Sequence, residues 1–344
     1  MMTQNISDIE SLDRELRNRL IGIRRLSCVV HCLTIVVYAA VLYWVTYCIY
    51  TSFWGWRIGQ GISDDAWIFI AGAFVVFLVL HFLLMYGLTL LKDRETQVMR
   101  KAIRHLFPDA VYSINSTISR SIIKDSALFD LFSSDKDAVD FTGYGSIVFR
   151  GESGSAAIYD IGVTSGRFLG IVKKLPAVGF LVTLYYSVVR PIFGAPIENS
   201  LHNFRGMFGM RAGSIECKGN VILLPDRLED KIGYLAHSIQ SYRNKNGARH
   251  VILEDVEFES LFAVYADDEV EARKILTPAM MQRITNLRRA FGKELLISFS
   301  GNRIYYAVSF PDGFLRPTRE SLNNEKLFEQ IFYEINLGRK LISQ

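Results

Sequence analysis

The stretch LSCVVHCLTIVVYAAVLYWVTYCIYTSFW, residues 26–54, contains no lysine, arginine, aspartate or glutamate, and neither does AWIFIAGAFVVFLVLHFLLMYGLTLL, residues 66–91. Each stretch exceeds the ~20 apolar residues that a helix needs to cross the hydrocarbon core of a bilayer. We therefore predict a hairpin of two transmembrane helices joined by a short external loop, residues 55–65. A signal peptide is the alternative for the first stretch, but the stretch is too long for its apolar region and no small-residue cleavage site follows.

Basic residues predict the orientation of this hairpin. Ten of them flank the two apolar stretches, whereas the loop holds only Arg57. The flanking residues are Arg14, Arg17, Arg19, Arg24 and Arg25 before the first helix, and Lys92, Arg94, Arg100, Lys101 and Arg104 after the second. Because basic residues beside membrane helices stay on the cytoplasmic side, residues 1–25 form a cytoplasmic segment, and both termini of this multi-pass chain lie in the cytoplasm.

Polar residues inside the apolar stretches are candidates for function. His31 and His81 differ in depth by ~7 Å at 1.5 Å per residue, which argues against a direct pair. We expect neutral histidines that bond across the hairpin or to a partner helix; a proton path is the alternative. Cys28 and Cys32 are four residues apart and share a helix face, as an acylation site or as packed small residues.

The remaining chain predicts an α+β cytosolic domain of antiparallel strands with packed helices. Residues 92–118 form a juxtamembrane helical connector, whose helix ends before Pro108, and the domain itself covers residues 119–344. We predict helices at 118–129, 230–242, 268–276, 278–291 and 325–335. We predict strands at 146–149, 156–161, 204–211, 221–224, 251–253 and 261–265, and a hairpin of strands 295–299 and 304–308 around Ser300-Gly301-Asn302.

An acidic stretch, residues 254–271, holds the best candidates for chemistry. Asp267, Asp268 and Glu271 are the metal-site candidates, because clustered carboxylates bind Mg²⁺ or Ca²⁺. The alternative is a structural role: Asp268 caps a helix, Glu271 three positions on completes a capping box, and Arg273 forms a surface ion pair. The further carboxylates of this stretch are Glu254, Asp255, Glu257, Glu259 and Glu269.

Six motifs follow one another along the domain: IIKDSALFDLF (122–132), NFRGMF (203–208), VILLPD (221–226), LED (253–255), FESLFAVYADDEVEARKILTP (258–278) and ISFSGNRIYYAVSF (297–310). In this order they resemble the bacterial DUF3137 family, a domain of unknown function, over residues 119–312. The most specific piece is VYADDEVEARKILTP, residues 264–278. The resemblance implies a bacterial protein of the cytoplasmic (inner) membrane with two membrane helices ahead of the domain, no established activity and a LemA-type membrane partner. The motif residues are Phe204, Arg205, Gly206, Asp226, Asp267, Asp268, Glu271, Ala272, Arg273, Thr277 and Pro278.

The chain departs from the family in an apolar insert, residues 166–200. An uncharged run, residues 175–189, is too short to span a bilayer but suits an interfacial segment. We predict that it lies on the membrane surface; a helix or hairpin buried against the core and an oligomer contact are the alternatives. The predicted membrane-interface residues are Lys173, Lys174, Phe180, Leu181, Tyr185, Tyr186 and Arg190.

Two classes of function follow from these patterns. The first is a non-enzymatic, membrane-tethered interaction or scaffold module that faces the cytoplasm, and the alternative is a membrane-bound metal-dependent enzyme that uses residues 254–271. Transport is a weaker third option. We predict no catalytic residue and no cofactor, because the sequence contains no G-x-S-x-G, P-loop or H-E-x-x-H motif. The predicted partners are the lipid bilayer, a second copy of the chain and a LemA-type protein; a net charge of +4 without a basic, aromatic-interleaved stripe does not favour nucleic acid.

Overall fold

The computed structural model describes residues 2–57, 64–114, 118–129, 139–151, 154–165, 204–225, 248–310, 313–315, 324 and 326–342. The chain divides into two compact units. One unit contains the helical hairpin, Leu16–Met99, and the other contains the sheet domain, which begins at Arg100.

Two long helices, α1 (Met2–Arg57) and α2 (Asp64–Leu106), form the hairpin. Both extend well past the apolar stretches into the basic flanks, because neither flank contains a proline or another helix-breaking signal before Pro108. The segments Arg14–Thr51 and Ala71–Leu106 are long and apolar enough to cross a membrane. Only 6% of each apolar window is buried, so these helices differ from the buried core helix of a soluble protein.

The described strands form a seven-stranded antiparallel sheet, which confirms the predicted α+β class. They are β1 (Ala110–Ile114), β2 (Val139–Gly151), β3 (Gly154–Ser165), β4 (Phe204–Pro225), β5 (Arg249–Val251), β6 (Phe262–Ala266) and β7 (Leu295–Ser309). Their order is β1-β2-β3-β4-β6-β5, and β7 pairs with β4. Strand β1 lies within the predicted helical connector: the helix there ends at Leu106, as predicted from Pro108, and an extended strand follows.

The predicted hairpin around Ser300-Gly301-Asn302 is wrong. β7 is one strand that pairs along its length with β4, from Gly206↔Ser309 to Leu223↔Ile297. Likewise, the strands predicted at 204–211 and 221–224 are two halves of β4. The register shifts between Ala212 and Asn220, where Gly219 has φ +105° and, on the facing strand, Gly301 has φ +56°. These glycines therefore form irregularities within long strands rather than a chain reversal.

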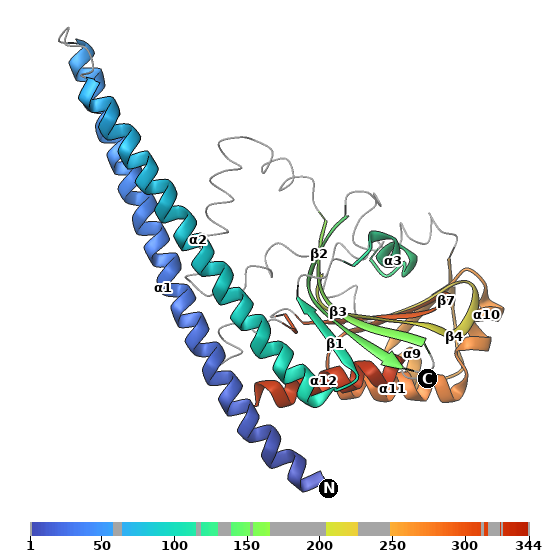
Figure 1. Ribbon diagram of the computed structural model, residues 1–344. Helices are drawn as coiled ribbons and strands as arrows, with labels where there is room; N and C mark the ends of the chain where they lie inside the picture. Colours follow the sequence, from blue (N-terminus) through green and yellow to red (C-terminus); the bar gives the residue numbers. More distant parts are fainter. Residues whose placement is uncertain are drawn as a thin grey trace. The chain divides into compact units, whose positions relative to one another are not determined.

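Helices cover both faces of the sheet (Figure 1). One face carries α3 (Arg120–Asp125), which is shorter than the predicted 118–129. The opposite face carries α11 (Pro278–Phe291) and α12 (Leu327–Ile342), the latter longer than predicted, and the short helices α9 (Val256–Glu259) and α10 (Glu269–Ile275) connect the strands.

Aromatic side chains dominate the core between α3 and the sheet. The Phe129 ring lies 5.2 Å from that of Phe204 and 5.7 Å from that of Phe208, and Tyr305 stacks on Phe208 at 6.0 Å. All four side chains are buried. On the other face, the Tyr306 hydroxyl donates to Met207 Sδ over 3.4 Å. A closed core on each side of β4 and β7 holds the central strands rigidly.

Candidate functional site

The F-R-G motif lies at the start of β4, and each residue has a separate structural task. Phe204 is buried in the aromatic core below α3. A Cβ added at Gly206 would overlap the Val308 carbonyl oxygen and lie 2.8 Å from the nitrogen of Phe310, so only glycine allows this approach of β4 to β7. Arg205, between them, points to the opposite face from Phe204, as the strand alternation requires.

Arg205 forms a buried ion pair with Asp160 of β3, a residue that the sequence reading did not single out. Arg205 Nη2 lies 3.1 Å from Asp160 Oδ2, and Nη1 donates to Oδ1. The same Oδ2 accepts the backbone amides of Leu315 at 3.0 Å and Phe314 at 3.3 Å. Burial raises the pKa of the Asp160 carboxyl, whereas Arg205 and these amides act to lower it. A lone carboxylate in the apolar strand AAIYDIGV was the available sequence signal.

Asp267 binds the irregular part of β4. Its Oδ2 accepts the backbone amide of Asn220 at 2.8 Å and the Asn220 side-chain amide at 3.0 Å, while its own amide donates to the Asn220 carbonyl at 3.1 Å. This reciprocal contact lies beside Gly219, where a Cβ would come within 3.1 Å of Asp267 Oδ2. Asp267 thus fixes the strand where its register shifts.

The other two metal-site candidates also bind the chain itself. Asp268 is the N-cap of α10 and accepts the amide of Val270 at 2.9 Å, as predicted. Glu271 turns to β4, where its Oε2 lies 3.5 Å from the Lys218 amide, and it pairs with Lys274 at 3.3 Å. Among the residues that the structure describes, no group of three or more histidine, cysteine, aspartate or glutamate side chains could hold a metal ion.

The upstream carboxylates of the acidic stretch follow the same pattern. Asp255 caps α9 by accepting the Phe258 amide at 3.0 Å, Glu259 accepts the Leu253 amide at 2.6 Å, and Glu257 pairs with Arg289. Of these, Asp255 satisfies an amide group that a helix start leaves without a partner, and the other two carboxylates bind a loop amide and a surface arginine.

The rest of the 264–278 motif positions α10 and α11. Ala272 is fully buried, and Arg273 pairs with Glu269 at 2.8 Å and donates to the Ile252 carbonyl at 2.8 Å. Thr277 is the N-cap of α11, with Pro278 in the first turn, and the left-handed Gly292 ends the helix, all as predicted.

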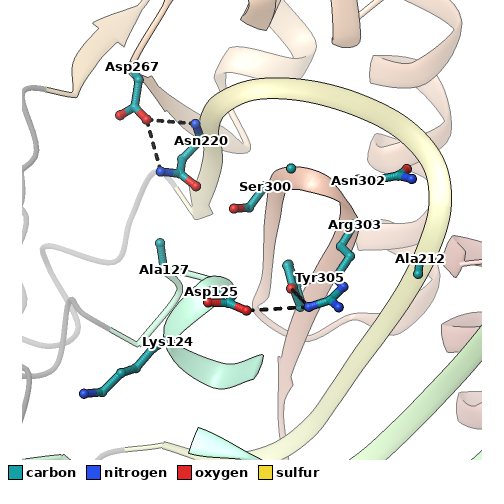
Figure 2. Close-up of a pocket in the computed structure, with 11 residues that line it drawn as sticks. Lys124, Asp125, Ala127, Ala212, Asn220, Asp267, Ser300, Asn302, Arg303 and Tyr305 are labelled. Atoms are coloured by element: carbon teal, nitrogen blue, oxygen red, sulfur yellow. Dashed lines mark hydrogen bonds and ion pairs between the residues drawn. The ribbon is translucent and has the colours of Figure 1, made fainter. Parts of the chain in front are cut away.

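A polar pocket of about 710 Å³ lies where β4 and β7 are both irregular (Figure 2). Asp267 and Asn220 form one wall, and Ser300 faces the open centre. Opposite them, Asp125 of α3 lies 3.5 Å from the Arg303 guanidinium, which also donates to the Tyr305 hydroxyl. The lining combines the Asp125–Arg303 ion pair and the Asp267–Asn220 contact with Lys124 and uncharged polar groups, and such a lining suits polar contacts rather than burial of an apolar ligand.

Cys217 of β4 is buried, close to the acidic side chains of this region. Burial and the nearby Glu271 and Asp267 carboxylates raise the pKa of its thiol to about 11. The thiol is therefore protonated near neutral pH and unreactive.

Polar contacts also connect the two helices of the hairpin. Arg24 Nη2 lies 2.8 Å from Glu95 Oε1, and the Tyr38 hydroxyl lies 2.8 Å from His81 Nδ1. His81 thus bonds across the hairpin, as expected, whereas His31 Nδ1 lies 2.7 Å from the Ser27 carbonyl of its own helix. Cys28 is half-buried and Cys32 exposed, so the two thiols do not form one packed face.

Several predicted residues lie outside the described part of the chain. They are the membrane-interface residues Lys173, Lys174, Phe180, Leu181, Tyr185, Tyr186 and Arg190, with the rest of the 166–200 insert, and Asp226 of the family motif, with the helix predicted at 230–242.

These features define a protein with an apolar helical hairpin and an antiparallel α+β domain. Residues 202–344 match the model of the family described as "Protein of unknown function (DUF3137)". The match includes the motifs from F-R-G onward. The crystal structure of the mycobacterial trehalose monomycolate transport factor A, TtfA, is similar at 8% identity and a TM-score of 0.34, over 71% of this chain and 96% of that chain. No curated protein matches the chain.

Proposed function

We propose that this protein is a membrane-tethered interaction module, anchored in a bacterial cytoplasmic membrane by its hairpin and carrying its sheet domain in the cytoplasm. The observation that carries the proposal is the exposed surface of the hairpin. Of the twenty-five large apolar side chains exposed in the described residues, twenty lie between Leu26 and Leu90. Soluble proteins rarely expose so large an apolar patch, and a bilayer would cover it.

The charge distribution supports an orientation with both termini in the cytoplasm. It can be tested with single cysteines in a chain whose four native cysteines are replaced by alanine. We expect Gly61→Cys in the loop to react with a membrane-impermeant maleimide in intact cells, and Thr3→Cys and Ser343→Cys to react only after permeabilisation. The opposite pattern, or equal labelling of all three, would contradict the orientation.

An interaction role for the domain is supported by exposed apolar side chains around its most specific motif. Val270 lies in the first turn of α10, Val256 begins α9 and Ile252 follows β5; all three are more than half exposed. Arg273 joins these segments by its bond to the Ile252 carbonyl. Exposed aliphatic residues beside a closed core fit a contact surface for another protein.

The first partner to test is the LemA-type membrane protein that the family resemblance implies. We expect full-length protein, extracted in mild detergent after cross-linking in the membrane, to retain it, and the Val256→Asp/Val270→Asp variant to lose it. Tyr333→Asp is the matched control, because Tyr333 is also exposed but lies on α12. Equal recovery in all variants, or recovery of none, would refute this role for the surface. The same cross-linking reports whether two copies of the chain associate.

The metal-dependent alternative would use Asp267, Asp268 and Glu271, whose carboxylates bind groups of the chain itself. Asp267→Asn with Asp268→Asn separates the two interpretations. A structural role predicts a loss of about 1–2 kcal/mol of stability. A catalytic role predicts loss of Mg²⁺ or Ca²⁺ binding, measured by calorimetry, with the fold unchanged.

A further inference from the structure

Two polar contacts between the helices of the hairpin, Arg24–Glu95 and Tyr38–His81, follow the same alignment of α1 with α2. Arg24 and Tyr38 are fourteen residues apart on α1, and their partners Glu95 and His81 are fourteen residues apart on α2. Fourteen residues correspond to two heptads, the repeat at which facing positions of paired helices recur. The contacts thus lie on one seam, about 21 Å apart at 1.5 Å per residue.

Buried residues between the two contacts belong to the same seam. His31, midway between Arg24 and Tyr38, is 9% exposed, and Thr34 is 1% exposed. Both satisfy their polar atoms within α1, His31 at the Ser27 carbonyl and Thr34 at the Val30 carbonyl over 2.8 Å. At these two positions the polar atoms thus bond within α1, whereas Arg24 and Tyr38 on either side bond across to α2.

Apolar packing alone would distinguish poorly between alignments of α1 and α2 that differ by one heptad. Lipid tails are as apolar as leucine, so an apolar side chain gains little by exchanging lipid neighbours for the other helix. A slide of one heptad in one direction would bring Tyr38 level with Phe74 and Arg24 level with Leu88. A slide in the other direction would bring His81 level with Val45 and Arg24 level with Ala102. The six residues 58–63 between α1 and α2 could span about 20 Å, enough to permit either slide.

Each slide would separate Tyr38 from His81. The slide that brings Tyr38 level with Phe74 brings His81 level with His31, and the opposite slide brings Tyr38 level with Leu88 and His81 level with Val45. The first of these slides would also move the Arg24 guanidinium into the apolar stretch, where a charge is costly. We propose that the Tyr38–His81 hydrogen bond and the Arg24–Glu95 ion pair select the register of the hairpin in the membrane. The inference rests on the proposed membrane insertion.

The test is disulfide formation in native membranes. The native cysteines are first replaced by alanine, and Thr34→Cys is then introduced on α1. In one variant it is combined with Leu84→Cys, which lies within one residue of the level of Thr34 on α2. In two others it is combined with Phe77→Cys or Leu91→Cys, which lie one heptad to either side of Leu84. We expect the Leu84→Cys pair to form fastest on mild oxidation. Tyr38→Phe with Glu95→Gln should then reduce that preference about 3- to 20-fold, the range expected for one interhelical hydrogen bond in a membrane.

Tyr86→Phe is the control, because it removes a hydroxyl from α2 at a position that is 64% exposed. It should leave the preference unchanged. A preference that survives Tyr38→Phe/Glu95→Gln, or that favours Phe77→Cys or Leu91→Cys from the start, would overturn the inference. Carbonate extraction of each variant separates this outcome from failure of the membrane anchor itself: protein released by carbonate would contradict the proposed function instead.

Discussion

Replacing Asp160 with asparagine tests whether the buried ion pair holds the sheet domain together. The carboxylate receives two contacts from Arg205 and two backbone amides, from Phe314 and Leu315. Asparagine keeps the shape and one acceptor oxygen, but its NH₂ group must face an N–H donor. The Arg205 charge, with only 2% of its side chain exposed, then loses the counter-charge of Asp160.

The expected cost follows from that burial. Removing one partner of a buried ion pair costs about 3–5 kcal/mol, because the remaining charge stays desolvated. For a domain of this size the loss lowers the melting temperature by roughly 6–20 °C. Arg205→Met should cost a similar amount. The double variant, Asp160→Asn/Arg205→Met, should cost clearly less than the sum, because it buries no charge and the asparagine oxygen still accepts the amides of Phe314 and Leu315.

The assay needs a reporter inside the domain. Tryptophan fluorescence does not provide one, because the four tryptophans are Trp44, Trp54, Trp56 and Trp67. Cys217 does, because it is 7% exposed and lies on β4. Full-length protein in mild detergent is titrated with urea and given a short pulse of iodoacetamide, and mass spectrometry of the Cys217 peptide gives the fraction opened at each concentration.

Two results would refute this reasoning. One is a loss below about 1 kcal/mol for Asp160→Asn, which would mean that the charge of Arg205 is solvated despite its burial. The other is a double variant whose cost equals the sum of the single costs within about 0.5 kcal/mol, since independent sites add and coupled sites do not. Asp268→Asn, at a helix cap on the surface of the same domain, is the control and should cost little, because asparagine caps a helix about as well as aspartate.

Gly206→Ala should destabilise the domain by about 1–3 kcal/mol or more in the same assay, because its methyl group would overlap the Val308 carbonyl; a neutral result would mean that β4 and β7 separate easily. Thr277→Ala should cost about 0.5–2 kcal/mol through loss of the bond to the Met280 amide, and Thr277→Ser should restore most of it. Alkylation of Cys217 without urea should be slow at pH 8 and should rise about tenfold per pH unit towards pH 11, because its raised pKa keeps the thiol protonated below that value. A rate at pH 8 equal to that of a free thiol would contradict the burial of Cys217.

Local signals in the sequence predicted the local elements well. The apolar stretches define α1 and α2, and Thr277-Pro278 with Gly292 gives the start and end of α11. These features depend on residues a few positions apart, through helix capping and the length of an apolar run. The Asp268 cap belongs to the same class.

The long-range features could not be predicted in this way. Ser300-Gly301-Asn302 has the composition of a turn, and only the pairing of β7 with β4 shows that the strand continues through it. The same holds for Glu271, whose spacing from Asp268 fits a capping box but whose side chain turns to Lys218, a residue 53 positions earlier.

The irregular centre of the sheet links these unpredicted features to the pocket. A regular β4 would carry unbroken pairing past Ala212 and Asn220, whereas the observed strand shifts register there and Asp267 binds the exposed amide of Asn220. Asn220 and Ser300 are still partners in the β4–β7 pairing, and both line the open pocket beside this irregular part of the two strands (Figure 2). Asp267 holds this irregular part of β4 in place, so Asp267→Ala should loosen the pocket wall while the domain stays folded. The Asn220 amide loses its acceptor in this variant, and its hydrogen exchange should therefore become faster than in the unaltered protein.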